Sequence, residues 1–424
     1  MAIESATRYL KTYGAVAVGL LGLVVAFNMV VDPYGVLPAM SVAGLNAHKP
    51  REVRFARLRK PFDVWRGHFD ALVLGTSQVE QSFDPEYLAP HGVRLYNLGL
   101  SELRLYEMAM LLDHAARTGD VKLAMISVDF VRYGTPPWGP SFLPRDWNRA
   151  RLVAQYGKSL TAFRTLLDSV ETIEANRSGQ PVFEHLPGGR LNVEEMFDRA
   201  AVAGIPGAFD AIDAVYLNDT YRPYVKQHER LTERGFDHTD LRRLIRVARD
   251  RDVRLYLFIP PSHARQMEII AFLGLLPLME QWKTELVCTI MEAAGTGAHV
   301  ELWDFSGYNA VTTEAVPTAG ASRPMQWYYD PVHFSIRTAS AMMNAMLRLQ
   351  DAQYASLDAF GTMLTPTNVQ RHFSAIRQSR DRYLTEHPDV SATLARLYSG
   401  PPRIDSDRAH AARSPGCSEA RARR

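Results

Sequence analysis

The chain has 424 residues, with 48 basic and 46 acidic side chains and a formal net charge of +2. A hydrophobic content of 46% excludes wholesale disorder, and the length suits one large domain with insertions or two domains. The near-neutral charge gives no footprint for nucleic acid. Two cysteines, Cys288 and Cys417, are too few for a disulfide framework or a cysteine-rich zinc site. We expect no bridge between them, because Cys417 lies in a tail whose composition is typical of disorder.

An apolar segment at residues 15–31 is the first feature along the chain. Its seventeen residues contain one polar side chain, Asn28. As a helix the segment covers about 25 Å, near the lower limit for crossing a bilayer. We predict an uncleaved signal anchor. Two alternatives remain open: a cleaved signal peptide, which lacks well-placed small residues before Asp32, and a soluble core helix, which would show polar interruptions.

The basic residues around this segment indicate its orientation. Arg8, Lys11 and the α-amino group precede it, whereas only Lys49 follows it before the basic cluster at residues 51–60. The positive-inside rule therefore favours a cytoplasmic N-terminus and an exported body, although the cluster weakens the asymmetry. Membrane lipid around this helix is the first expected partner.

From residue 70 onward, strand and helix patterns alternate. Short apolar runs predict buried strands at residues 70–75, 93–97, 122–130, 253–259 and 300–304. Amphipathic stretches predict helices at residues 103–116, 149–175, 240–251, 277–294 and 336–349. Strands separated by helices indicate an α/β fold in which a parallel sheet has helices on both faces, a three-layer α/β/α arrangement.

These patterns also suggest a division of the chain. We expect a cytoplasmic N-terminus and anchor, a basic membrane-proximal linker, the α/β domain, C-terminal helices and a disordered basic tail, at residues 1–35, 36–69, 70–350, 351–399 and 400–424. Within the α/β domain, a helical insertion at about residues 134–235 interrupts the alternation and is predicted to cap the sheet.

Ser77 is the first candidate for chemistry. It follows the first strand directly, in the sequence Gly75-Thr76-Ser77. Ligands bind at the carboxyl edge of parallel sheets, so a serine at this point can act as a nucleophile. The alternative is that Ser77 only caps a helix.

Asp330 and His333 form the second candidate, in a loop before the helix at residues 336–349. An Asp and a His three positions apart can serve one nucleophile, the His as base and the Asp as the carboxylate that orients it. The alternative is a turn in which Asp330 binds backbone and Ser335 caps the helix. The third candidate is Asn97-Leu98-Gly99 after the second strand, where Gly99 either supplies an N–H group to an oxyanion or only permits a turn.

Taken together, the three motifs resemble those of the SGNH (GDSL-like) hydrolase superfamily. They are most similar to its membrane-anchored, exported branch, which includes alginate O-acetyltransferases and D-alanyl-lipoteichoic acid transfer proteins. The resemblance spans about residues 70–349, without the insertion. It implies Ser77 as nucleophile, His333 as general base, Asp330 as its carboxylate, and the N–H groups of Ser77 and Gly99 as oxyanion donors.

One position departs from the family pattern. After the third strand, the Asn that would donate to the oxyanion is replaced by Asp129. An ionised carboxylate cannot donate a hydrogen bond and repels negative charge, and the loss of one such donor costs about 10²- to 10³-fold in rate. Asn97 and Asp129 are therefore retained as possible substrate-binding residues, together with His263 and Arg265, which follow the fourth strand.

The resemblance implies a single-pass protein of the bacterial inner membrane with a periplasmic catalytic domain. It would move an acyl group, acetyl first among the candidates, onto or off a cell-surface polysaccharide through a Ser77 acyl-enzyme, without metal or cofactor. A multi-span membrane protein would supply the acyl group to a transferase. The alternatives are a plain esterase and a catalytically inactive SGNH-like scaffold that binds glycan or organises a polysaccharide synthase.

Overall fold

The computed structural model divides the chain into two compact units. The N-terminal unit contains Met1–Gly67 and Pro144–Leu186, and the sheet unit contains His68–Leu143 and Pro187–Arg424. Residues 144–186, the first part of the expected insertion, thus belong to the same compact unit as the N-terminal helix. The structure describes residues 2–38, 41–133, 143–179, 182–193, 204–295, 297–317, 325–357, 360–400, 403–404 and 417. Most of the tail predicted to be disordered lies outside these residues.

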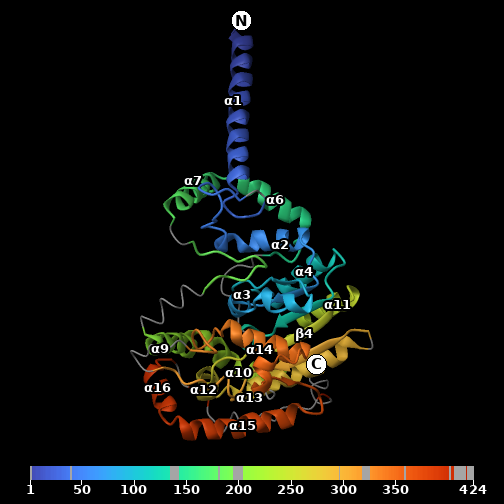
Figure 1. Ribbon diagram of the computed structural model, residues 1–424, viewed down its shortest axis with the longest axis vertical. Helices are drawn as coiled ribbons and strands as arrows, with labels where there is room; N and C mark the ends of the chain where they lie inside the picture. The colour runs from blue at the N-terminus through green and yellow to red at the C-terminus, as the bar shows by residue number, and fades with distance from the viewer. Residues whose placement is uncertain are drawn as a thin grey trace. The chain divides into compact units, whose positions relative to one another are not determined.

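The N-terminal unit is helical. Its α-helices are α1 (Ala2–Val31), α2 (Ala56–Arg66), α6 (Arg149–Leu160) and α7 (Phe163–Ser178). Among the described residues, α1 is the one helix long and apolar enough to cross a membrane. Figure 1 shows most of α1 projecting from α6 and α7, which it contacts at its C-terminal end. The single helix expected at residues 149–175 is broken because the Thr161 hydroxyl donates to the Lys158 carbonyl and ends α6 there.

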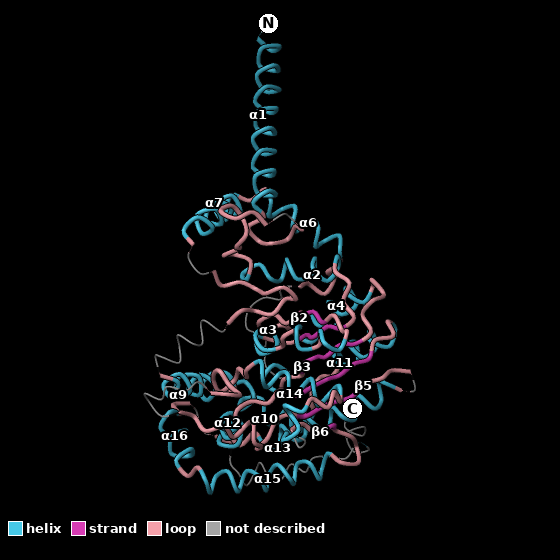
Figure 2. Tube along the Cα trace, in the orientation of Figure 1, coloured by secondary structure: helices cyan, strands magenta, loops and turns pink. Residues whose placement is uncertain are grey.

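The sheet unit has the predicted α/β fold. Its strands are β1 (Ala71–Leu74), β2 (Leu95–Asn97), β3 (Leu123–Ser127), β4 (Arg254–Ile259), β5 (Val300–Asp304) and β6 (Thr362–Met363), in the order β2-β1-β3-β4-β5-β6 (Figure 2). The first five pair in parallel, as expected, and β6 adds an antiparallel edge. Two residues are too few for β6 to leave a pattern in the sequence.

Every residue of β1 is buried, which shows that both faces of the sheet are covered at this strand. The α-helices of this unit are α3 (Ser77–Ser82), α4 (Leu105–Ala116), α5 (Phe130–Tyr133), α9 (Ile205–Val215), α10 (Arg222–Arg234), α11 (Thr239–Asp250), α12 (Ala264–Phe272), α13 (Leu276–Ala294), α14 (Ile336–Leu347), α15 (Val369–Glu386) and α16 (Asp389–Leu397). One face packs Val73, Met125 and Phe258 against α3 and α14. Helix α11 contacts both α4 and α13.

The strand order creates a switch point between β1 and β3, because the chain moves to one side of β1 to form β2 and to the other side to form β3. In open parallel sheets, ligands bind outside the carboxyl ends of the strands at such a point. Ser77 follows β1 and Asp129 follows β3. Two of the residues singled out from the sequence therefore flank the position where this fold type places its ligands.

A disulfide joins Cys288 of α13 to Cys417, with the two Cα atoms 5.3 Å apart. The expectation that these cysteines stay unpaired was wrong. It rested on the composition of the tail, and composition does not exclude that one tail residue is held against a folded helix.

Candidate active site

Ser77 is the first residue of α3, two positions after a tight strand-to-helix turn at Gly75. A Cβ atom on Gly75 would lie 2.3 Å from Val79 Cγ2 and 2.8 Å from Ser127 Cβ, so only glycine lets the chain turn this closely. The N–H groups in the first turn of a helix have no partners within that helix. The Ser77 N–H is therefore suited to receive a hydrogen-bond acceptor from a ligand.

The loop that carries Asp330 and His333 is a compact turn. Tyr328 and Phe334 pair as an antiparallel bridge at its base. Asp330 Oδ1 accepts the backbone N–H groups of Val332 and His333, each at 2.8 Å. Ser335 then caps α14 by accepting the Thr338 N–H. The turn and cap that the sequence offered as an alternative are thus both present, and they leave Asp330 Oδ2 available to another partner.

Ser77, His333 and Asp330 form a continuous chain of hydrogen bonds. Ser77 Oγ lies 2.9 Å from His333 Nε2, and His333 Nδ1 lies 2.7 Å from Asp330 Oδ2. The carboxylate accepts from Nδ1, which leaves Nε2 as the acceptor for the Ser77 hydroxyl. This is the geometry of a nucleophile, a base and an orienting carboxylate. The structure therefore brings together the three residues to which the sequence assigned these roles.

The charge of Asp330 is set by opposing effects. Burial by itself raises the pKa of a carboxyl group, but the neighbouring His333 and the N–H groups of the turn outweigh it and hold the pKa of Asp330 below its ordinary value. Asp330 is therefore a carboxylate at neutral pH. In this form it keeps the proton of the imidazole on Nδ1 and stabilises the imidazolium that forms when Nε2 accepts a proton.

Two side chains of α3 fasten this helix to the His333 loop. Gln78 Nε2 donates to the Val332 carbonyl at 2.8 Å, and Ser82 Oγ donates to the Phe334 carbonyl. The nucleophile and its base are therefore held by the same set of contacts. Sequence analysis missed Gln78, and its position directly after the serine was the only signal that could have found it.

Asn97 and Gly99 have structural roles. Asn97 is fully buried, and its Nδ2 donates to the carbonyls of Val79 and Phe83 at 2.7 and 2.8 Å. Its Oδ1 accepts the Gly99 N–H at 2.9 Å. A Cβ atom on Gly99 would lie 2.5 Å from the Glu80 nitrogen, so this glycine permits close approach to α3. The structure thus directs Asn97 toward α3 and the Gly99 N–H toward Asn97, away from the roles expected for them.

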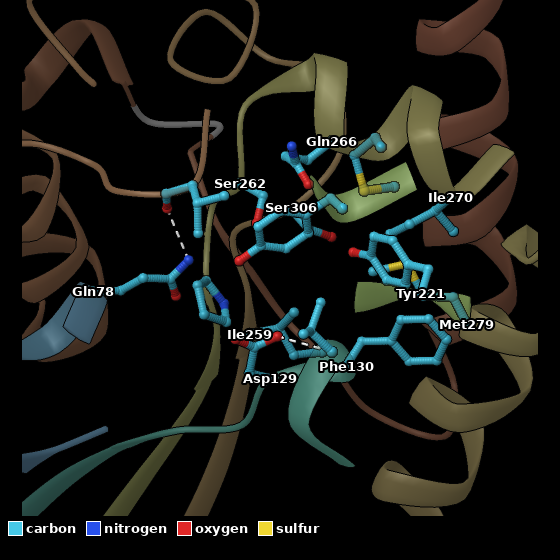
Figure 3. A pocket seen from close by; sticks show the side chains of 15 residues that line it. Gln78, Asp129, Phe130, Tyr221, Ile259, Ser262, Gln266, Ile270, Met279 and Ser306 are labelled. Carbon is cyan, nitrogen blue, oxygen red and sulfur yellow. Dashed lines mark hydrogen bonds between the residues drawn. The ribbon is translucent and has the colours of Figure 1, made fainter. Parts of the chain in front are cut away.

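A small pocket of about 30 Å³ is lined by Gln78 and Val332, the chain neighbours of Ser77 and His333 (Figure 3). Figure 3 shows Gln78 and Asp129 on one side and Tyr221 on the other. The polar groups that line it come from Gln78, Asp129, Tyr216, Tyr221, Ser262, Gln266 and Ser306. Tyr216 lies in a π-helical turn between α9 and α10, and burial raises its pKa, so it keeps a phenol proton to donate. The sequence showed no pattern that could have identified these tyrosines.

Asp129 accepts the Val131 N–H through Oδ1 at 3.0 Å. Burial raises the pKa of this carboxyl above its ordinary value, against the opposing charge of Arg132. A protonated carboxylic acid is a hydrogen-bond donor, as the side chain of an Asn would be. The objection that Asp129 repels an oxyanion applies only to its ionised form, which burial disfavours.

His263 and Arg265 do not join the triad. His263 is buried, caps α12, and its Nε2 lies 2.8 Å from the Glu314 carbonyl oxygen. Burial lowers its pKa to about 4, so the ring is neutral at neutral pH. Arg265 pairs with Asp210 and Asp213 at 2.7 and 2.6 Å. Arg265 therefore links α12 to α9, whereas His263 links the start of α12 to Glu314.

Within the described ranges, no group of three His, Cys, Asp or Glu side chains is placed to hold a metal ion. No family model and no curated protein matches the sequence.

Proposed function

We propose that this protein is a membrane-anchored serine acyltransferase or esterase of the SGNH (GDSL-like) type, acting on O-acyl groups of a cell-surface polysaccharide. The observation that carries the proposal is the hydrogen-bonded chain from Ser77 through His333 to Asp330. The position of Ser77 at the switch point of a parallel sheet supports it. The polysaccharide and the acetyl group, as the first candidate acyl group, come from the resemblance of the sequence motifs.

The reaction has two halves. Ser77 Oγ attacks the acyl carbonyl while His333 Nε2 takes the hydroxyl proton. The tetrahedral oxyanion receives the Ser77 N–H and, from the pocket, protonated Asp129 or Tyr216 as candidate donors. The imidazolium then gives its proton to the departing alcohol, which leaves an ester on Ser77. In the second half, a polysaccharide hydroxyl or water loses its proton to His333 and attacks this ester, and Ser77 recovers its proton.

The acceptor in the second half decides between a transferase and an esterase. The pocket beside Gln78 and Val332 is partly apolar, since Phe130, Ile259, Met267 and Ile270 are among its lining residues. A transferase needs an acyl donor, and a multi-span membrane protein is the partner that we propose for that step.

Two further observations support an extracytoplasmic location and an uncleaved anchor in the bacterial inner membrane. Disulfides persist in oxidising compartments, and Cys288 is bonded to Cys417. The end of α1 is part of the N-terminal unit, since Asn28 and Val31 are buried there. Cleavage behind the apolar segment would remove part of that core.

The decisive experiment uses the full-length protein in detergent with a fluorophosphonate probe. We expect covalent labelling at Ser77 that is lost in Ser77→Ala and His333→Ala and kept in Ser374→Ala, a control on the exposed face of α15. Hydrolysis of p-nitrophenyl acetate, with and without an oligosaccharide acceptor, then separates transfer from hydrolysis. Folded protein that takes up no probe, or labelling that persists in Ser77→Ala, refutes the proposal.

A second candidate is a catalytically inactive scaffold that binds glycan or organises a polysaccharide synthase. The observation in its favour is that the Gly99 N–H donates to Asn97, which leaves fewer oxyanion donors than the family pattern implies. On this hypothesis, Ser77→Ala keeps its function in cells, and oligosaccharide stabilises wild type and variant equally against thermal unfolding.

A further inference from the structure

The helix α7 buries polar residues on one side and, in its N-terminal half, exposes apolar residues on the other, which is the reverse of the usual pattern in a soluble protein; its C-terminal half exposes Glu174 and Arg177. Its four buried residues are Thr165, Asp168, Ser169 and Thr172, all of them polar. Its large exposed side chains include Phe163, Leu167 and Val170, which are 71%, 46% and 43% exposed. The spacing of three and four residues puts these three on one stripe of the helix. A helix with this pattern is suited to apolar surroundings.

The buried polar residues of α7 are satisfied inside the N-terminal unit. Asp168 accepts the Tyr34 hydroxyl at 2.8 Å, and Ser169 Oγ donates to Asn28 Oδ1 at 2.8 Å. Asn28 Nδ2 donates in turn to the Leu160 carbonyl at the end of α6. The one polar side chain in the apolar segment of α1 is thus covered by α6 and α7, and the polar side of α7 is used for this contact.

The length of α1 indicates where this contact lies. One side of α1 becomes covered from Val24 onward, where Val24, Val25, Phe27, Asn28 and Val31 are buried or half-buried, whereas Leu20, Leu21 and Leu23 are exposed. The nine apolar residues before Val24 extend only about 14 Å, whereas the hydrocarbon core of a bilayer is about 30 Å thick. Residues 24–31 must then also lie within the membrane if α1 is to span it, and the ends of α6 and α7 that contact them lie at the same depth.

We propose that α7 is a second membrane-binding element, whose stripe of Phe163, Leu167 and Val170 inserts into the lipid leaflet nearest the folded body. The bilayer is the occupant because α7 contacts α1, whose large exposed side chains are apolar. Lys158 and Arg164 are exposed near the start of the stripe, where basic side chains can reach lipid headgroups, and Arg164 also pairs with Asp168 at 3.0 Å. The inference rests on the membrane anchoring by α1 that is part of the proposed function, and it is independent of the chemistry at Ser77.

Site-directed spin labelling of the full-length protein in liposomes of phosphatidylcholine and phosphatidylglycerol tests the proposal. Single cysteines replace Phe163, Leu167 and Val170 in turn. Leu20→Cys in α1 serves as the lipid reference and Ala375→Cys on α15 as the water reference. The native cysteines are paired and do not take up the label, and wild-type protein carried through the same labelling measures the background. Collision rates with oxygen, which concentrates in lipid, and with a water-soluble nickel complex then report depth.

We expect the labels on the stripe to show oxygen-to-nickel collision ratios close to that at Leu20 and several-fold above that at Ala375. Ratios like that at Ala375, together with a lipid-like ratio at Leu20, overturn the insertion of α7 and leave the anchor intact. Water-like ratios at Leu20 as well refute both the insertion and the anchor. Stripe labels that are immobile and shielded from both reagents show a protein partner on this face and also overturn the proposal.

Discussion

Asp330 holds His333 through both of its carboxylate oxygens. Oδ1 accepts the backbone N–H of His333 at 2.8 Å, and Oδ2 lies 2.7 Å from Nδ1 of its ring. The first bond fixes the loop, and the second fixes the orientation and tautomer of the imidazole. One side chain therefore serves the fold and the chemistry together, and a substitution can be chosen that affects mainly the second.

Asp330→Asn is that substitution. An amide oxygen still accepts the backbone N–H groups of the turn, so we expect a small change in melting temperature. The amide cannot stabilise the imidazolium and favours the wrong tautomer, so the rate of ester cleavage should fall by about 10³- to 10⁴-fold. Steady-state hydrolysis of p-nitrophenyl acetate measures this, with Asp381→Asn on exposed α15 as the matched control. Equal rates in the two variants would show that Asp330 is only structural.

Asp129 predicts a specific pH dependence. Burial raises its pKa in the folded protein, so the hydrogen-bond-donating acid is lost as the pH rises through that value. Activity that depends on this donor therefore declines on the alkaline side. In Asp129→Asn the amide donates at every pH, so the decline attributable to Asp129 should disappear. Initial rates across the pH range, compared with an Asp381→Asn control, measure this effect.

The raised pKa of Asp129 also affects the stability of the folded protein. A carboxyl whose pKa is raised by folding favours the folded state at low pH, and this contribution is lost as the pH rises through the folded value. The melting temperature of Asp129→Asn minus that of the wild type should therefore increase as the pH increases. If Asp129→Asn has no esterase activity at any pH, the role of Asp129 as a hydrogen-bond donor is contradicted.

Gly99→Ala tests the contact between the turn after β2 and α3. The added methyl group would lie 2.5 Å from the Glu80 nitrogen and 2.9 Å from Asn97 Oδ1. Overpacking of this kind costs about 1–3 kcal/mol, and any shift of α3 also moves Ser77. We expect a lower melting temperature and reduced labelling by fluorophosphonate. Gly157→Ala, where a Cβ atom meets nothing within 4 Å, is the control and should be neutral or stabilising.

The disulfide predicts a redox-dependent stability. Cys288 and Cys417 are 129 positions apart, and closing a loop of this size in the unfolded chain is worth about 5 kcal/mol in the chain-entropy model. We expect Cys417→Ser to melt at a lower temperature than the oxidised wild type and to be insensitive to reductant. Mass spectrometry of non-reduced peptides should recover the Cys288–Cys417 pair. Full alkylation of both cysteines without reductant would exclude the bond.

The sheet and the triad could be predicted because their signals are local or topological. The apolar runs that became β1 and β3 are contiguous in sequence, and parallel strands bring their carboxyl ends to one edge, where Ser77 and His333 meet. The contacts of Asn97 with the carbonyls of α3 join residues 14 and 18 positions apart and follow no periodicity.

The other differences between the sequence predictions and the structure also depend on residues that are far apart in the sequence. The inclusion of residues 144–186 in the N-terminal unit is set by helices that pack against α1, and nothing near those residues in the sequence indicates it. The protonation state of Asp129 depends on burial by several elements, and the Cys417 bond depends on a helix that precedes it by more than a hundred positions. Chain-local patterns contain no information about such partners.

The serine and its histidine are separated by 256 positions. During synthesis, β1 and α3 emerge long before the loop that carries Asp330 and His333, so the serine hydroxyl has no base while most of the chain is still being made. If Ser77 is the proposed nucleophile, a chain that ends anywhere before His333 contains it without its base. On that proposal, the order of residues along the polypeptide keeps the serine inactive until the loop before α14 has folded beside α3.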